Sequence, residues 1–190
     1  MDYAERLMLL FREKGAYLEG HFQLSSGLHS PNYMQCAKLL QYPSIAGELG
    51  ERLASHFKEA DLVLSPALGG IIIGHEVARA LNVPFLFCER EDNEFRLRRG
   101  FQIEPGRRVV VVEDVVTTGL STKETVAVAE REGARMIGIG SIVDRSVGPL
   151  PFAAPFFSLL KLPLAQYRPE SCPLCRQNLP LVKPGSRPKG

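Results

Sequence analysis

Residues 109–122 read Val-Val-Val-Val-Glu-Asp-Val-Val-Thr-Thr-Gly-Leu-Ser-Thr and carry the strongest signal in the chain. Four consecutive valines predict a strand that is buried on both faces of a sheet. The hydroxyl-rich turn leads into a helix, and the backbone N–H groups at such a helix start suit a phosphate. The adjacent acids Glu113 and Asp114, expected at the exit of the strand, are costly to bury unless they hold a cation or hydroxyl groups. A phosphorylated sugar with vicinal hydroxyls therefore fits this segment.

Two common phosphate-binding motifs do not match the segment. A Walker loop needs a Gly-Lys-Ser/Thr ending, and the dinucleotide fingerprint needs three spaced glycines. The alternative is an acidic turn and a hydroxyl-capped helix without a ligand, but so many polar groups at one strand end are expensive to arrange for stability alone.

Outward from this segment, strands alternate with helices, which predicts the α/β class with a mostly parallel sheet flanked by helices. The expected strands are 62–64, 85–87, 109–112 and 136–143, and the expected helices are 2–14, 44–58, 70–81 and 121–132. Ser44 is expected to cap the second of these helices. In such sheets ligands bind at the carboxyl ends of the strands.

The length of 190 residues predicts a single domain. We expect a small, irregular or β-rich N-terminal subdomain over about 15–40, a core over about 44–168 and a tail over 169–190. The end of this tail, from Lys183 onward, is rich in proline and glycine and is expected to be extended.

Composition excludes several classes of partner. The chain is 45% hydrophobic and 23% charged, with a formal net charge of +2, which gives no support for nucleic-acid or membrane binding. No run approaches the roughly 18 apolar residues that a membrane span needs, and no signal peptide is recognised. Four cysteines in a chain with a sizeable core favour a reducing, cytoplasmic location.

The run Glu113–Gly119 resembles the phosphoribosyl diphosphate signature of the type I phosphoribosyltransferases. Nearly the whole chain resembles the orotate phosphoribosyltransferase family within this group. Residues 20–31 (GHFQLSSGLHSP) resemble the hood that covers the base, and residues 143–146 (VDRS) resemble the segment that closes over orotate. The resemblance implies transfer of ribose 5-phosphate from 5-phosphoribosyl 1-diphosphate to orotate, a step of pyrimidine biosynthesis.

The resemblance also implies roles for individual residues. Glu113 and Asp114 would bind the ribose hydroxyls, and Arg145 would pair with the orotate carboxylate, for which a planar guanidinium is apt. Contacts to phosphoribosyl diphosphate are implied for Leu68, Gly69, Gly70, Arg90, Glu113, Asp114, Val115, Val116, Thr117, Thr118, Gly119, Leu120 and Ser121. Contacts to orotate are implied for Tyr33, Met34, Thr117 and Arg145, although an aromatic residue such as Tyr33 is more often part of a core.

The basic stretch 90–99 resembles the family's mobile catalytic loop but lacks the lysines and the histidine of the better-known pattern. Ser25 likewise stands where a lysine is common. Arginine does not readily donate a proton, so stabilisation of the departing diphosphate is the better hypothesis than acid catalysis. Arg90, Arg96, Arg98 and Arg99 are the candidates, with Arg90, Arg96, Arg98 and Asp114 as the expected catalytic residues. The alternative is a solvated charged hairpin.

The resemblance implies Mg²⁺ as the cofactor, held through substrate oxygens and water rather than by direct protein ligands. It also implies a homodimer. Two other functions stay open: a phosphoribosyltransferase for a purine or another base, and a regulator that binds phosphoribosyl diphosphate without catalysis.

Cys172 and Cys175 have the spacing of a zinc knuckle, but a structural zinc site needs four ligands and the sequence shows one such pair. Cys36, Cys88 or histidines could complete the site, yet their spacing does not indicate it. The sequence therefore favours a pair without metal.

Overall fold

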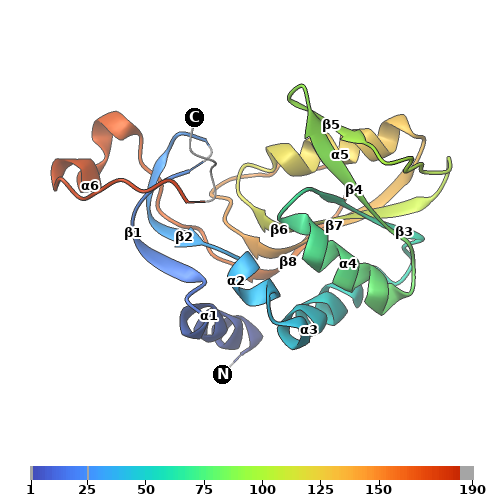
Figure 1. Cartoon of the computed structure of the whole chain (residues 1–190), viewed down its shortest axis with the longest axis horizontal. Coiled ribbons are helices and arrows are strands. Elements are labelled where there is room, and N and C mark those ends of the chain that lie inside the picture. Colours follow the sequence, from blue (N-terminus) through green and yellow to red (C-terminus); the bar gives the residue numbers. More distant parts are fainter. Residues whose placement is uncertain (1, 25, 185–190) are drawn as a thin grey trace.

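The computed structural model describes residues 2–24 and 26–184, in which a two-stranded and a six-stranded sheet lie side by side (Figure 1). The larger sheet has the order β5-β4-β3-β6-β7-β8, and only β5 is antiparallel to its neighbour. This confirms the α/β class with a mostly parallel sheet. The strands are β3 (Leu62–Pro66), β4 (Phe85–Glu91), β5 (Glu94–Leu97), β6 (Arg108–Val116), β7 (Arg135–Asp144) and β8 (Phe156–Lys161).

Helices cover both faces of this sheet, as Figure 1 shows. The valines of β6 alternate between two cores: Val110 and Val112 pack with the side of α1, α3 and α4, and Val109 and Val111 pack with the side of α5. All four are fully buried, as the valine run predicts. The helices are α1 (Tyr3–Glu13), α2 (Ala37–Leu40), α3 (Pro43–Ala54), α4 (Gly70–Leu81), α5 (Leu120–Arg131) and α6 (Pro173–Arg176).

Strand β6 is longer than the valine run, which corrects the expected position of the two acids. It continues to Val116 because β7 runs alongside it, pairing Glu113 with Ser141 and Val115 with Val143. Glu113 and Asp114 therefore lie within the strand rather than beyond its exit. Successive side chains of a strand point to opposite faces, so the two carboxylates diverge.

The start of α3 also differs from the expectation. The helix begins at Pro43, its N-cap is Tyr42, and no side chain caps it, so the prediction of Ser44 as the cap is wrong. Proline suits the first helical position because it lacks an N–H and has a fixed φ. The helix ends at Ala54, short of Lys58.

The hood is an antiparallel hairpin of β1 (Tyr17–Gln23) and β2 (His29–Met34). The C-terminal segment crosses it: Tyr167 pairs with His29 and Val182 pairs with Phe22. A short 3₁₀ helix (Pro169–Ser171) and α6 lie between these two contacts. Much of the expected tail therefore packs on the hood, while Ser25 and residues 185–190 lie outside the described residues.

The basic stretch is a β-hairpin in this structure. Strands β4 and β5 pair through Glu91 and Glu94, and the turn residues Asp92 and Asn93 both have positive φ. Asparagine and aspartate tolerate that conformation, and such turns match the twist of the strands. Separately, none of the helices within residues 2–24 and 26–184 has the length and apolar character needed to cross a membrane.

Candidate active site

A cavity of about 900 Å³ lies where the hood meets the carboxyl end of β6 and the start of α5. Most of the predicted binding residues line it, although they come from separate parts of the chain. The predicted residues that it brings together are Tyr33, Met34, Asp114, Val115, Thr117, Thr118, Leu120, Ser121 and Arg145.

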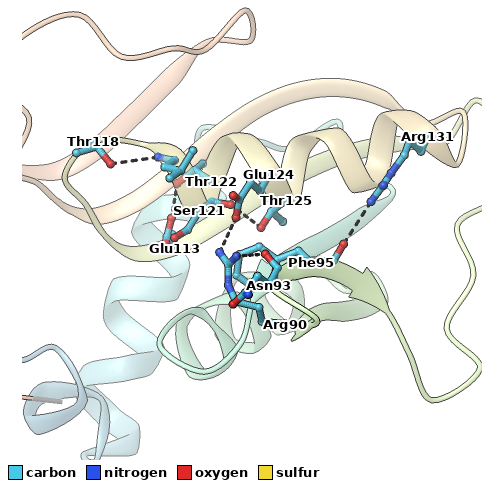
Figure 2. Close-up of polar contacts among 11 residues, drawn as sticks. Arg90, Asn93, Phe95, Glu113, Thr118, Ser121, Thr122, Glu124, Thr125 and Arg131 are labelled. Atoms are coloured by element: carbon cyan, nitrogen blue, oxygen red, sulfur yellow. Dashed lines mark hydrogen bonds and ion pairs between the residues drawn. The ribbon is translucent and has the colours of Figure 1, made fainter. Parts of the chain in front are cut away.

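The turn before α5 has the form expected for a phosphate site. Gly119 has a φ of +75°, and a Cβ atom there would come within 2.8 Å of the Phe152 ring. Glycine is therefore required both by backbone conformation and by packing. The Thr118 hydroxyl accepts a hydrogen bond from the N–H of Leu120 (Figure 2). The turn thus has a backbone conformation that suits a phosphate, and the start of α5 lies at the cavity.

Asp114 lies on the cavity side of β6 and is half-buried. Burial raises the pKa of its carboxyl group, and hydrogen bonds from the backbone N–H groups of Asp114 and Val115 partly oppose this shift. A Cβ atom on Gly69 would come within 2.7 Å of the carboxylate, so the start of α4 lies directly against it. A ligand with hydroxyl groups would relieve the cost of this burial.

Glu113 points to the other face of β6, where it accepts a hydrogen bond from the hydroxyl of Thr122 on α5 (Figure 2). Burial raises the pKa of Glu113 to about 7, the Thr122 hydrogen bond lowers it, and the charge of Asp114 raises it. The carboxylate is not part of the cavity lining, so its contact with a ribose stays a prediction.

Arg145 is the most unusual residue of the site. Its side chain lines the cavity at 3% exposure, and its Nε and Nη2 atoms have no hydrogen-bond partner among the described residues. The adjacent Asp144 is already paired with Lys161 at 2.6 Å. Burial lowers the pKa of the guanidinium group. A buried cation with two free donors is costly unless an anion completes it.

The hood and the residue after it contribute both apolar and polar side chains to the cavity, which are Gln23, Leu24, Ser26, Tyr33, Met34 and Gln35. Tyr33 packs on Phe22 with ring centroids 5.8 Å apart, and Met34 is buried beside it. Burial raises the pKa of the Tyr33 hydroxyl, and the charge of Asp114 raises it further. Tyr33 and Met34 thus line the cavity together with Arg145, and the aromatic ring of Tyr33 suits a planar base.

Other predicted residues lie at or near the cavity without lining it. Leu68, at 81% exposure, and Gly69 follow β3, and Gly70 begins α4. Val116 is buried in β6, and Gly119 packs closely against the ring of Phe152.

The arginines of the hairpin do not line the cavity and are bound to carboxylates. Arg90 binds Glu124 of α5 and the carbonyl of Asn93, and it stacks over the ring of Phe95 at 4.2 Å (Figure 2). The other pairs are Arg96 with Glu94, Arg98 with Glu91, and Arg99 with Glu89. Their role in catalysis therefore stays a prediction.

Lys123 lines the cavity one turn into α5. It was not predicted from the sequence. Its backbone N–H donates to the carbonyl of Gly119 at 2.8 Å, so the lysine follows directly from the phosphate turn. The sequence did offer a signal, because Lys123 is a cation that directly follows the hydroxyl-rich residues 117–122.

Comparisons with known proteins agree with this geometry. The phosphoribosyl transferase domain family matches residues 37–174. The orotate phosphoribosyltransferase of Caldanaerobacter subterraneus subsp. tengcongensis is 51% identical over 185 residues, which cover 96% of this chain and 97% of that protein. The orotate phosphoribosyltransferase of Thermotoga maritima is 51% identical over 180 residues, which cover 94% and 96%.

Solved structures show the same likeness. The crystal structure of orotate phosphoribosyltransferase from Aeropyrum pernix matches with a TM-score of 0.68 and 27% identity, covering 82% of this chain and 93% of that chain. A crystal structure of adenine phosphoribosyltransferase matches with a TM-score of 0.64 at 19% identity, which shows a shared fold alone.

Proposed function

This chain belongs to the orotate phosphoribosyltransferase family, pentosyltransferases of pyrimidine biosynthesis, and we propose how its cavity performs that reaction. Ribose 5-phosphate moves from 5-phosphoribosyl 1-diphosphate to N1 of orotate, and the products are orotidine 5′-monophosphate and diphosphate. The observation that carries the choice of base is Arg145, whose buried and unpartnered guanidinium calls for a planar anion. The orotate carboxylate supplies that anion in bidentate geometry.

The remaining groups bind different parts of the two substrates. The turn 117–121 and Lys123 hold the 5-phosphate, because most of these residues line the cavity at the start of α5 and offer backbone N–H groups, hydroxyls and a positive charge. Asp114 binds the ribose hydroxyls and stabilises the positive charge that develops on the sugar as the bond to diphosphate breaks. Tyr33 packs on the orotate ring, and Arg145 orients it so that N1 faces the sugar.

Mg²⁺ is part of this proposal, and the residues present fit it. A half-buried carboxylate against the Gly69 backbone leaves room for hydroxyl groups or water but offers no multi-carboxylate cage. Asp114 and the loop at Leu68–Gly70 would hold the ion through water and substrate oxygens, as a hydrated Mg²⁺ prefers. When bound, Mg²⁺ neutralises charge on the diphosphate. The hairpin arginines would add positive charge there, and a cytoplasmic homodimer completes the proposal.

The test follows the ultraviolet absorbance of orotate with phosphoribosyl diphosphate and Mg²⁺. We expect turnover with orotate and none with adenine or guanine. Turnover with a purine alone would replace this proposal with the purine alternative, and binding of phosphoribosyl diphosphate without turnover on any base would favour a regulator.

Asp114→Asn tests the site itself. We expect kcat/KM to fall on the order of 10²-fold or more, because the charge that stabilises the transition state is lost while the shape is kept. Circular dichroism should show an unchanged fold. A near-normal rate would remove Asp114 from the mechanism.

A further inference from the structure

Four potential metal ligands lie close together where the C-terminal segment packs on the hood, outside the cavity described above. They are His21 of β1, His29 of β2, and Cys172 and Cys175 of the C-terminal segment. Their ligand atoms all lie within 4.8 Å of one another. The exposed fractions of His21, His29 and Cys172 are 3%, 4% and 1%, so all three are buried, and Cys175 is half-buried. We propose that these side chains form a structural zinc site of the Cys₂His₂ type.

The distances fit one small ion. Cys172 Sγ and Cys175 Sγ lie 3.6 Å and 3.7 Å from His21 Nε2, and Cys175 Sγ lies 3.3 Å from His29 Nδ1. A tetrahedron with ordinary Zn–S and Zn–N bonds has sulfur-to-nitrogen edges of about 3.5 Å. The two ring nitrogens are 2.9 Å apart and would separate by a few tenths of an ångström around zinc. The arrangement is therefore close to a zinc coordination shell.

The hydrogen bonding around His21 provides a second observation. Its Nδ1 lies 2.8 Å from the carbonyl oxygen of Leu179, which can only accept, so Nδ1 carries the proton. The lone pair of His21 therefore lies on Nε2, the atom that faces His29 and both thiols. The 2.9 Å contact requires the Nδ1–H of His29 to donate to this lone pair, and the lone pair is then not available to either thiol. A cation resolves this conflict, and a carbonyl that orients a ligating histidine is typical of zinc sites.

The position of these four residues in the fold indicates what a bound zinc ion would do. The backbone pairs of Tyr167 with His29 and of Val182 with Phe22 bracket the two cysteines. Zinc would join the C-terminal segment to both strands of the hairpin that carries Tyr33 and Met34. Figure 1 shows this segment, in orange and red, lying beside β1 and β2 at the end of the molecule away from β5. A two-stranded hairpin is marginally stable alone, so such a link would fix the hood over the cavity.

The two histidines explain why the cysteine pair looked incomplete in the sequence. His21 and His29 stand nearly 150 residues before Cys172, and only the hood hairpin brings the four together. This proposal is independent of the orotate reaction, because none of the four residues lines the cavity.

The first experiment measures metal in the untagged, full-length protein purified under reducing conditions, by inductively coupled plasma mass spectrometry. We expect about one zinc ion per chain. Replacement by Co²⁺ should give the visible bands of a tetrahedral ion and a thiolate charge-transfer band. Protein without zinc that also fails to give these cobalt bands would overturn the proposal. A Cys172–Cys175 disulfide found in the intact mass would overturn it as well.

The second experiment compares variants. Cys172→Ser and His29→Ala should lose zinc, whereas Cys88→Ala, which removes a buried thiol elsewhere, should keep it. Zinc retained by Cys172→Ser would overturn the proposal. Since a variant could fail to fold, the wild-type protein is also treated with a chelator and then with trypsin. We expect faster cleavage after Arg176, with zinc addition restoring protection, and equal cleavage in both states would contradict a zinc link.

Discussion

At the scale of single residues, a role of Arg145 in substrate binding can be distinguished from a role in the stability of the fold. Its guanidinium is buried, and two of its nitrogens have no partner within residues 2–24 and 26–184, so we expect it to cost stability unless an anion binds there. Arg145→Met keeps the apolar stem and removes the charge. We expect a melting temperature at least equal to that of the wild type, and a fall in kcat/KM for orotate on the order of 10²-fold or more.

The control for Arg145→Met is the affinity for phosphoribosyl diphosphate alone, measured by calorimetry, which should change little. A variant with reduced melting temperature and normal orotate kinetics would show that Arg145 acts in the fold instead.

Glu113 predicts a pH dependence of stability. Its pKa of about 7 in the folded protein exceeds its ordinary value of 4.5, so the folded state binds more protons between these two values. Stability is therefore lost as the pH rises through this window, on the order of 3 kcal/mol for this group. Glu113→Gln, which can still accept from Thr122, should show a smaller loss between about pH 5 and pH 8 in urea unfolding. An identical pH profile in the variant would contradict the assignment.

At the scale of elements, the sequence predicted what local pattern controls. The valine run and the turn that leads into α5 determine structure through nearby residues. The strand at 109–112 and the helices expected at 70–81 and 121–132 are confirmed, the last within one residue at each end. The end of β6 was missed because its hydrogen bonds come from β7, which the local sequence does not contain. For the same reason the sequence could not show that Glu113 and Asp114 face opposite sides.

Gly69, the N-cap of α4, and Gly74, in the second turn of that helix, allow a prediction about this element. A Cβ atom on Gly69 would come within 2.7 Å of the Asp114 carboxylate, whereas one on Gly74 would press into Ser65 and Phe85 in the interior. Gly69→Ala should therefore displace Asp114 and lower kcat/KM at least tenfold with little change in melting temperature. Gly74→Ala should instead lower stability by about 1–3 kcal/mol. Thermal unfolding and steady-state kinetics on both variants distinguish these effects, and equal activity in Gly69→Ala and wild type would contradict the close approach.

At the scale of the whole molecule, the sequence could not show which distant segments meet. The cavity joins the hood, the end of β6 and the residues after β7, and the C-terminal segment folds back onto the hood. The resemblance to a family predicted that the hood, the end of β6 and the residues after β7 form one site. Composition and spacing alone did not predict it. The contact of the C-terminal segment with the hood was missed because Tyr167 and Val182 pair with the hood through backbone groups, which carry no sequence signal.

The hairpin arginines raise the question of whether one protomer completes the site of another. Arg96 and Arg98 are half-exposed, form ion pairs with acids of their own hairpin and do not line the cavity of their own chain. If they act across a two-fold dimer, a mixture of two inactive variants regains activity. In an equal mixture of Asp114→Asn with Arg96→Ala/Arg98→Ala, half of the dimers are hybrids with one intact site each. We expect about a quarter of the wild-type rate after subunit exchange. No recovery would show that the hairpin acts within its own chain, and full activity of the arginine variant alone would remove it from catalysis.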